Sequence, residues 1–176
     1  MGLNKRKRVY RWWVGWEPEK TERWIEAMEA EGWHLTRISL NAIRFDFEKG
    51  EPRKMRYGID FQNTQDPSYK EIFSDTGWEL IYSGAGWYVW RMPYTEKRPE
   101  IYTDVLSLIE RNKRLMSVLV FALIAQFPLI VLNVPRFINF HNYYALWVIY
   151  FLLIGLLGYG SYRLIMINQK LKNKLK

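Results

Sequence analysis

The sequence predicts an α+β domain followed by two transmembrane helices, and three observations lead to this prediction. A pattern of strand, helix, strand and strand occurs twice, with a constant shift of 45 residues. All 18 acidic residues lie at or before Glu110 in a chain of 176 residues. Two long uncharged stretches come after them. The chain therefore divides into a polar half that can form a domain and an apolar half suited to a bilayer.

Each repeat begins with a strand in which apolar residues alternate with other residues. The repeats are predicted over residues 9–47 and 54–92, and their first strands over 9–16 and 55–61. The match between the repeats is carried by residue type and order, for example Gly-Trp-His-Leu in the first and Gly-Trp-Glu-Leu in the second. We read this recurrence as an internal duplication.

A helix should follow the first strand of each repeat. The helices should begin at Pro18 and Pro67, because proline fits the first turn of a helix. They should end at Gly32 and Gly77, because glycine readily adopts the left-handed backbone of a C-terminal cap. The glutamates of the first helix (Glu17, Glu19, Glu22, Glu26, Glu29 and Glu31) are read as its solvated side, with an acidic docking surface as the alternative.

A hairpin should complete each repeat. The predicted strands are 34–40 with 42–47, and 79–83 with 87–92, joined by turn residues around Asn41 and at Gly84-Ala85-Gly86. The expected product is a duplicated β-α-β-β domain over residues 9–92, ferredoxin-like or SHS2-like. Its six strands should form one mostly antiparallel sheet with both helices on one face.

Residues 115–134 form the first uncharged stretch, and their 20 residues suffice to cross a hydrocarbon core of roughly 30 Å. The second span is predicted over 145–167. The remaining predicted segments are a basic tail at 1–8, a linker with an amphipathic juxtamembrane helix at 93–114, an external loop at 135–144 and a basic tail at 168–176. The pattern leaves open whether 99–114 dock on the domain, lie on the membrane or continue the first span.

Basic residues flank the two spans on the side away from the short loop. Because Lys and Arg stay on the cytoplasmic side, we expect a two-pass protein of the cell membrane with both termini and the soluble domain in the cytoplasm. The basic start of the chain is followed by 9–16, which carry Arg11 and lack the apolar core of a signal peptide.

Three runs in the soluble half, EKTERWIEAMEAEGWHL, FEKGEPRKMRYGIDF and DTGWELIYSGAGWYVWR, resemble domain-of-unknown-function family 2812. The resemblance covers about residues 8–92. It implies uncharacterised bacterial membrane-anchored proteins that are often encoded beside PadR-type regulators, and hence a role in a regulated membrane or envelope response. It implies no catalytic residues.

Seven residues are candidates for a binding surface on the sheet face away from the helices. They are Arg11, Trp13, Arg44, Asp46, Arg56, Asp60 and Arg91. One interpretation is cross-strand Arg–Asp pairing on a solvated sheet. The other is a docking or anion-binding surface, in which guanidinium groups bind a carboxylate or phosphate beside an aromatic ring.

No catalytic, metal or cofactor site is predicted. The chain has no cysteine, and its two histidines, His34 and His141, are expected on opposite sides of the membrane. Nucleic acid is not an expected partner, because residues 1–114 hold 20 basic residues against 18 acidic ones.

The sequence therefore predicts a non-catalytic binding domain that acts as a sensor or regulatory adaptor at the lipid bilayer. Its partner would be a protein or a small ligand. The alternative is a small accessory subunit of a membrane transporter or envelope complex, in which the helices determine what it binds.

Overall fold

A computed structural model describes residues 5–63, 67–99, 101, 105–137, 144–173 and 175. The chain divides into two units, Met1–Thr103 and Asp104–Lys176. Residues 138–143, most of the predicted external loop 135–144, lie outside the described residues.

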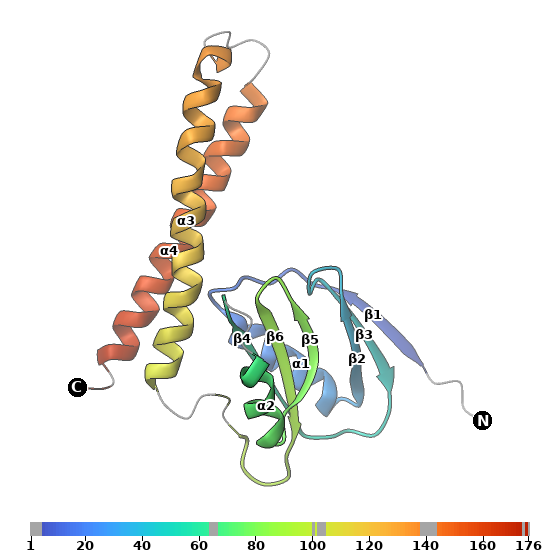
Figure 1. Ribbon diagram of the computed structural model, residues 1–176. Helices are drawn as coiled ribbons and strands as arrows, with labels where there is room; N and C mark the ends of the chain where they lie inside the picture. Colours follow the sequence, from blue (N-terminus) through green and yellow to red (C-terminus); the bar gives the residue numbers. More distant parts are fainter. Residues whose placement is uncertain are drawn as a thin grey trace. The chain divides into compact units, whose positions relative to one another are not determined.

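The first unit contains the predicted order of elements twice (Figure 1). Each half forms a three-stranded antiparallel sheet in which the last strand is central, with the orders β1-β3-β2 and β4-β6-β5. The first half comprises β1 (Arg6–Tyr10), α1 (Pro18–Ala30), β2 (Trp33–Ser39) and β3 (Arg44–Lys49). The second half comprises β4 (Met55–Phe61), α2 (Pro67–Asp75), β5 (Glu79–Gly84) and β6 (Trp87–Pro93). The predicted α+β class and the β-α-β-β order are confirmed.

The ends of equivalent elements agree as well. Gly32 and Gly77 follow the two helices with φ of 78° and 86°, the left-handed backbone predicted for them. A β-bulge interrupts β2 between Leu35 and Arg37, and another interrupts β5 between Leu80 and Tyr82. The two bulges are separated by the same 45-residue shift as the sequence repeat.

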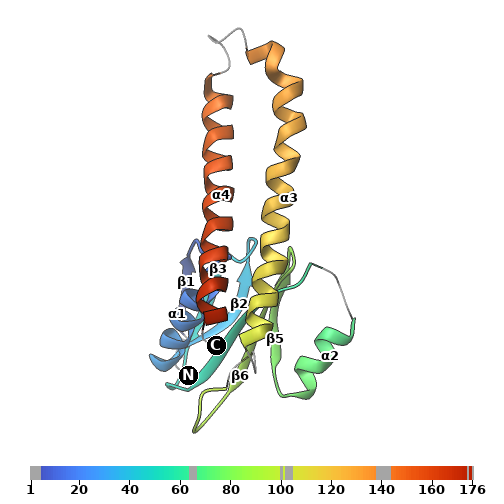
Figure 2. The same ribbon diagram turned by 90° about the vertical axis from the view of Figure 1, so that its left-hand side faces the viewer.

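The prediction of one six-stranded sheet is wrong. β2 and β5 lie side by side, but no ladder joins them, so the domain has two three-stranded sheets (Figures 1 and 2). Both facing strands are bulged, and a bulge interrupts regular pairing. In addition, the Leu35 carbonyl accepts a hydrogen bond from the Arg91 side chain, at 3.1 Å.

The two helices contact opposite faces of the second sheet, which corrects the prediction that they share one face. α1 packs on the side of Tyr57 and Ile59, where its Ile25 and Met28 join a core that also includes buried residues of the first sheet. α2 packs on the other side. There Tyr69 and Phe73 contact Trp90, which is fully buried. The second sheet is thus covered on both faces, and every residue of β4 is buried.

The first strand is shorter and earlier than predicted, since β1 spans Arg6–Tyr10 rather than 9–16. Its partner β3 begins at Arg44, opposite Tyr10, so there is no further strand against which β1 could continue. The next residue, Arg11, donates its amide to the Ile43 carbonyl at 2.8 Å. The predicted basic tail 1–8 therefore belongs partly to a sheet.

The second unit consists of α3 (Val105–Phe137) and α4 (Tyr144–Asn173). Both are long and apolar enough to cross a membrane, over Val105–Leu132 and Trp147–Asn173. In the most apolar windows of these segments only 6% and 17% of the residues are buried, so most of their side chains are at least partly exposed. α3 is continuous from Val105, and residues 105–114 therefore extend the first span as one helix. α4 likewise extends beyond 145–167 into the predicted tail 168–176.

A polar contact joins the two helices. The Asn112 side-chain amide donates a hydrogen bond to Asn168 Oδ1 at 2.9 Å, and both side chains are buried. Leu115 and Leu164 are buried as well.

Candidate functional site

The seven predicted site residues do not form one surface. Arg44 and Asp46 lie on the solvent side of the first sheet, whereas Arg11 and Trp13 lie in the segment between β1 and α1. The other three lie on the second sheet, among them Arg56 and Asp60, which are buried. The prediction that Arg56 and Asp60 share an exposed sheet face is wrong, because α1, α2 and the segment after β6 cover β4.

Arg44 and Asp46 form the centre of what we call the basic face, the solvent side of the first sheet: Arg6, Arg8, Thr36, Arg37, Arg44, Asp46 and Glu48. Arg44 binds Asp46 through two nitrogens, at 3.1 and 3.0 Å, and Arg8 Nε lies 2.9 Å from the same carboxylate. Burial acts to raise the pKa of Asp46, but the hydrogen bonds and charges of Arg44 and Arg8 outweigh it and lower the pKa. Asp46 is therefore a firmly ionised centre between two arginines.

The basic face carries more positive than negative charge. Four arginines stand against Asp46 and Glu48, and Arg6 lies 3.0 Å from Glu48. Arg37 is exposed and has no ion-pair partner among the described residues. The face encloses a shallow hollow of about 470 Å³. Guanidinium groups with free donors around such a hollow can bind a carboxylate or phosphate.

Arg11 and Trp13 have structural contacts. The Arg11 guanidinium lies over the Trp24 ring of α1, 4.7 Å from its centroid. The Trp13 indole donates to the Ala42 carbonyl at 2.9 Å and packs edge-on against Trp87, with 4.8 Å between ring centroids. These contacts hold the segment after β1 against the domain.

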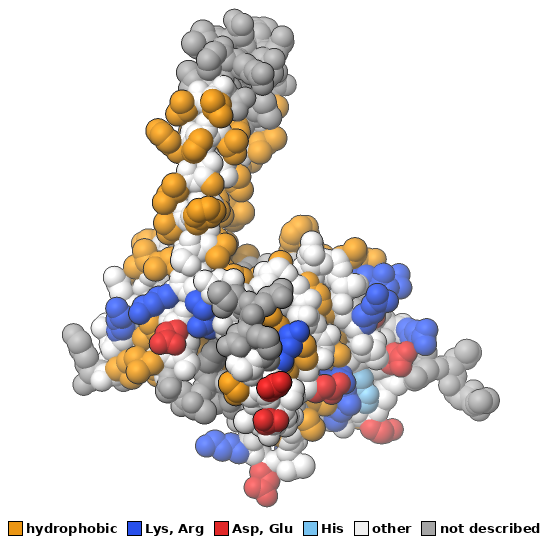
Figure 3. Space-filling model, in the orientation of Figure 1, with side chains coloured by type: hydrophobic (Ala, Val, Ile, Leu, Met, Phe, Trp, Pro, Cys, Tyr) orange, Lys and Arg blue, Asp and Glu red, His pale blue; other side chains and the backbone are white. Residues whose placement is uncertain are grey.

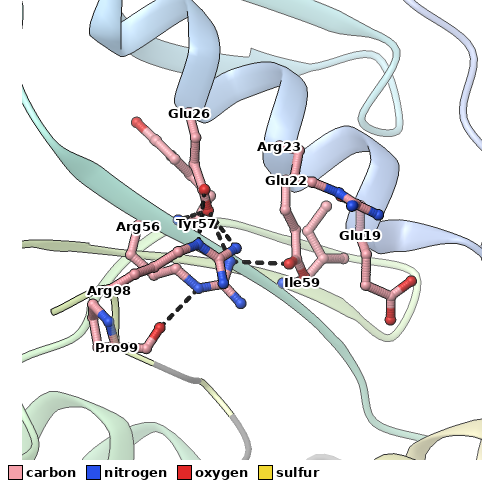
Figure 4. Close-up of polar contacts among 9 residues, drawn as sticks. All are labelled: Glu19, Glu22, Arg23, Glu26, Arg56, Tyr57, Ile59, Arg98 and Pro99. Atoms are coloured by element: carbon pink, nitrogen blue, oxygen red, sulfur yellow. Dashed lines mark hydrogen bonds and ion pairs between the residues drawn. The ribbon is translucent and has the colours of Figure 1, made fainter.

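Arg56 belongs to a second cluster, which we call the edge network: Glu22, Glu26 and Glu29 of α1 with Arg53, Arg56 and Arg98. Figure 4 shows its part around Glu22, Glu26, Arg56 and Arg98. Arg56 Nη1 lies 2.9 Å from a carboxylate oxygen of Glu22 and 2.9 Å from one of Glu26. Arg98 binds Glu26 through two nitrogens, both at 3.0 Å. Three glutamates that were read as solvated are thus paired, and Glu22 and Glu29 are buried.

The same glutamates cap the free edge of β4. Ile59 N donates to Glu22 at 2.9 Å, and Tyr57 N donates to Glu26 at 3.1 Å. The spacing explains the fit, because four residues of a helix rise about 6.0 Å and two residues of a strand about 6.8 Å. α1 can therefore lie along β4 and satisfy amides that no neighbouring strand pairs.

Glu29 continues the row one turn later. Its carboxylate accepts hydrogen bonds from the Leu35 amide, the Tyr57 hydroxyl and the Arg53 guanidinium, at 2.9, 2.7 and 2.6 Å. Burial acts to raise the pKa of Glu29, yet these donors and the Arg53 charge outweigh it, and the pKa is lowered. Burial, followed by the neighbouring Glu29 charge, raises the pKa of Tyr57, whose hydroxyl stays protonated.

The edge network also holds the segment that leads towards α3. Arg56 Nε donates to the Pro99 carbonyl at 3.0 Å, beside the Arg98–Glu26 pair. Two residues further on, Ile101 packs on the cluster of Trp78, Tyr88 and Trp90, and a Cβ at Gly58 would overlap its side chain. Gly58 is thus required for the close approach of this segment to β4.

The family model described as "Protein of unknown function (DUF2812)" matches residues 17–124, more than half of the chain. The chain belongs to this family. No curated protein and no solved structure matches it. The predicted resemblance over residues 8–92 is confirmed from residue 17 onward. The DUF2812 match also extends past β6 through the segment after it and into α3, so the family unit includes the whole edge network and part of the first apolar helix.

The two remaining predicted site residues of this DUF2812 domain, Asp60 and Arg91, also form contacts within the domain. Asp60 accepts hydrogen bonds from the Phe61 amide and the Tyr69 hydroxyl, at 2.7 and 2.8 Å. Arg91 binds Glu79 through two nitrogens, at 2.8 and 2.7 Å. This hydrogen-bonded pairing lowers the pKa of Glu79.

His34 and the acidic residues do not group into a metal centre where the structure is described. His34 Nε2 lies 2.7 Å from the Glu51 carbonyl oxygen. Within the described ranges, no group of three His, Cys, Asp or Glu side chains could hold a metal ion.

Sequence reasoning missed the edge network. One signal for it was available: Glu22, Glu26 and Glu29 are spaced so that they share one side of a helix. A row of acids on a helix is usually solvated. Only the position of β4 beside α1 shows that these glutamates instead bind arginines and strand amides.

Proposed function

We propose that this DUF2812 protein is a non-catalytic, membrane-anchored binding domain that acts as a sensor or regulatory adaptor in a membrane or envelope response. It would cross the cell membrane twice, with both termini and the soluble domain in the cytoplasm. The long apolar helices support the anchoring, and the distribution of Lys and Arg around them supports the orientation.

The observation that carries the proposal is the attachment of Arg98 and Pro99 to the edge network. This segment precedes α3, and it is held by Glu26 through Arg98 and by Arg56 through the Pro99 carbonyl. A ligand that shifts α1 or β4 would change contacts on the chain that enters the membrane helix. A conformational change caused by binding in the domain could thus be transmitted through these contacts and along the chain to α3.

The surface proposed for binding is the basic face. Its excess of arginine suits an anionic group on a protein partner or a small ligand, and Arg37 offers donors that no described acid binds. The proposal assigns no reaction to this face.

The test is crosslinking in native membranes of four forms of the chain. They are wild type, a form in which α3 and α4 are replaced by an unrelated helix pair, Arg37→Glu on the basic face, and Arg23→Glu on the exposed side of α1. Arg23→Glu is the matched control for Arg37→Glu. A partner captured by wild type, by the helix replacement and by Arg23→Glu, but not by Arg37→Glu, supports the adaptor role.

The alternative function, an accessory subunit of a transporter or envelope complex, is favoured by one feature of α4. A Cβ placed at Gly155 or Gly158 would meet no atom within 4 Å, so this side of α4 is open to another helix. Loss of the captured partner on helix replacement, with Arg37→Glu unaffected, would favour this alternative and contradict the adaptor proposal.

A further inference from the structure

The end of the first sheet exposes an unusual group of apolar and aromatic side chains. Tyr10 is 62% exposed and Trp12 is 83% exposed, and Val14 and Leu40 are exposed as well. We call these four residues the sheet-end patch. Trp12 in particular presents almost its whole ring to the surroundings, although burying an aromatic side chain of this size is strongly favourable.

The exposure of Trp12 is imposed by its neighbours. Arg11 is held by its amide bond to the Ile43 carbonyl, and Trp13 is held by the Ala42 carbonyl and by Trp87. The chain on both sides of Trp12 is therefore fixed to the domain. Leu40 lies in the turn that provides these carbonyls, which brings it to the same end of the sheet.

Basic side chains adjoin this patch. Tyr10 lies directly opposite Arg44 in the β1–β3 register, and Arg8 and Arg37 follow on the basic face. Figure 3 shows hydrophobic side chains beside Lys and Arg side chains over this end of the domain. The acid nearest to them, Asp46, is already bound by Arg8 and Arg44.

This combination matches the chemistry of an anionic bilayer surface. Trp and Tyr favour the headgroup region because their rings have an apolar body and a polar group. Arginine binds lipid phosphate, and each basic residue near an anionic surface increases binding about fivefold, from roughly 1 kcal/mol. A protein partner with an anionic group could contact both surfaces, but the same chain carries two helices long and apolar enough to cross a bilayer, and this favours a lipid surface as the occupant.

We propose that the sheet-end patch inserts into the headgroup layer of an anionic membrane, with Trp12 deepest and the arginines of the basic face on lipid phosphates. The inference rests on the proposed function, because α3 and α4 supply the bilayer. Only three residues separate Ile101, which packs on the domain, from the start of α3 at Val105. So short a connection gives the patch a high effective concentration of lipid.

The test uses the full chain, which has no native cysteine, with single labels of an environment-sensitive dye. The label is placed at Trp12→Cys, at the control position Ile72→Cys on α2, which is 61% exposed, and at Phe121→Cys in α3. Each protein is reconstituted into vesicles of phosphatidylcholine alone or of phosphatidylcholine and phosphatidylserine in equal amounts. Quenchers attached to the lipid and quenchers dissolved in water then report where each dye lies.

We expect the dye at position 12 to be quenched from the lipid in the mixed vesicles and much less in phosphatidylcholine alone. The dye at position 72 should stay accessible to water in both. Adding Arg37→Gln to the Trp12→Cys protein should lower the ratio of inserted to free domain about fivefold.

Two results would overturn the inference while leaving the anchor intact. In the first, the dye at position 12 is accessible to water in both kinds of vesicle while the dye at position 121 is quenched from the lipid. In the second, the dye at position 12 inserts equally in both kinds of vesicle. A water-accessible dye at position 121 would instead overturn the proposed membrane anchoring. The inference about the sheet-end patch would then still be decided by whether the dye at position 12 is quenched from the lipid in the mixed vesicles.

Discussion

Arg56 on β4 and Glu22 on α1 form an ion pair in which each side chain is only 3% exposed, with 2.9 Å between Nη1 and the carboxylate. Glu22 also binds the Ile59 amide, and Arg56 also binds Glu26 and the Pro99 carbonyl. The pair thus joins a helix, a strand edge and the segment after β6. A buried charge that loses its partner is costly, and this makes the pair a sensitive point of the domain.

Replacing Arg56 by Met should lower the free energy of unfolding by about 3–5 kcal/mol, because it leaves Glu22 buried without its cation. Urea unfolding can be followed by tryptophan fluorescence, since eight of the nine tryptophans lie in the soluble half. Arg23→Met on the exposed side of α1 is the matched control and should cost less than about 0.5 kcal/mol. Equal losses in the two variants would contradict the structural role of Arg56.

The stability of the domain should fall in acid, partly through Glu29. The pKa of Glu29 is lower in the folded than in the unfolded chain, so the unfolded state takes up the proton first as the pH falls. The stabilisation is complete above the unfolded pKa of about 4.3 and is lost as the pH falls through the folded value. Asp46 and Glu79, whose pKa values are also lowered, act in the same direction.

The Glu29 contribution can be isolated by measuring urea unfolding between neutral pH and pH 3 in wild type and in Glu29→Gln. The variant should be less stable at neutral pH and should show a shallower loss of stability below pH 5. Parallel curves for the two proteins would show that Glu29 does not contribute to the acid sensitivity.

Gly58→Ala should loosen the segment after β6 from the domain, because the new Cβ would overlap the Ile101 side chain. We expect faster hydrogen exchange at the Arg98 and Ile101 amides and a stability loss of about 1–3 kcal/mol. Gly155→Ala is the control, since nothing lies within 4 Å of that position. Unchanged exchange at these two amides in Gly58→Ala would rule out the close approach of Ile101 to Gly58.

Two adjacent tryptophans should respond very differently to replacement by alanine. Trp13→Ala removes a hydrogen bond to Ala42 and the contact with Trp87, and it should cost about 3 kcal/mol. Trp12→Ala removes an exposed ring and should change the free energy of unfolding by less than about 0.5 kcal/mol. Urea unfolding of the two variants checks this, and a large loss in Trp12→Ala would mean that its ring is packed in solution.

The Asn112–Asn168 contact should couple α3 to α4. A double-mutant cycle with alanine at both positions should give a coupling energy of about 0.5–1.5 kcal/mol for helix separation. Separation can be followed in an SDS titration by energy transfer between dyes at two introduced cysteines. A coupling energy near zero would show that the amides find other partners.

Much of the architecture could be predicted from the sequence because it depends on local signals. The helix starts at Pro18 and Pro67 and the ends at Gly32 and Gly77 each depend on a single residue and its backbone geometry. The apolar helices depend on composition and length. Both kinds of signal can be read without knowing what lies beside the element.

The errors came from contacts between distant parts of the chain. Alternation in β4 correctly separates Tyr57 and Ile59 from Arg56 and Asp60, but it cannot tell whether the second face is also covered. After Tyr10 the alternation continues, although the partner strand has ended. The predicted site residues were scattered for this reason, and only Arg44 and Asp46 remain on the expected surface.

The row of glutamates on α1 has a consequence for how copies of this chain meet. An open strand edge is a template on which another chain can add a strand, and β4 is a continuous run of buried, largely apolar residues. Glu22 and Glu26 occupy its outward amides, so an incoming strand would have to displace two ion-paired carboxylates. In the proposed membrane-anchored state, copies would be crowded into two dimensions, and a strand edge blocked in this way would keep them from exchanging strands and aggregating.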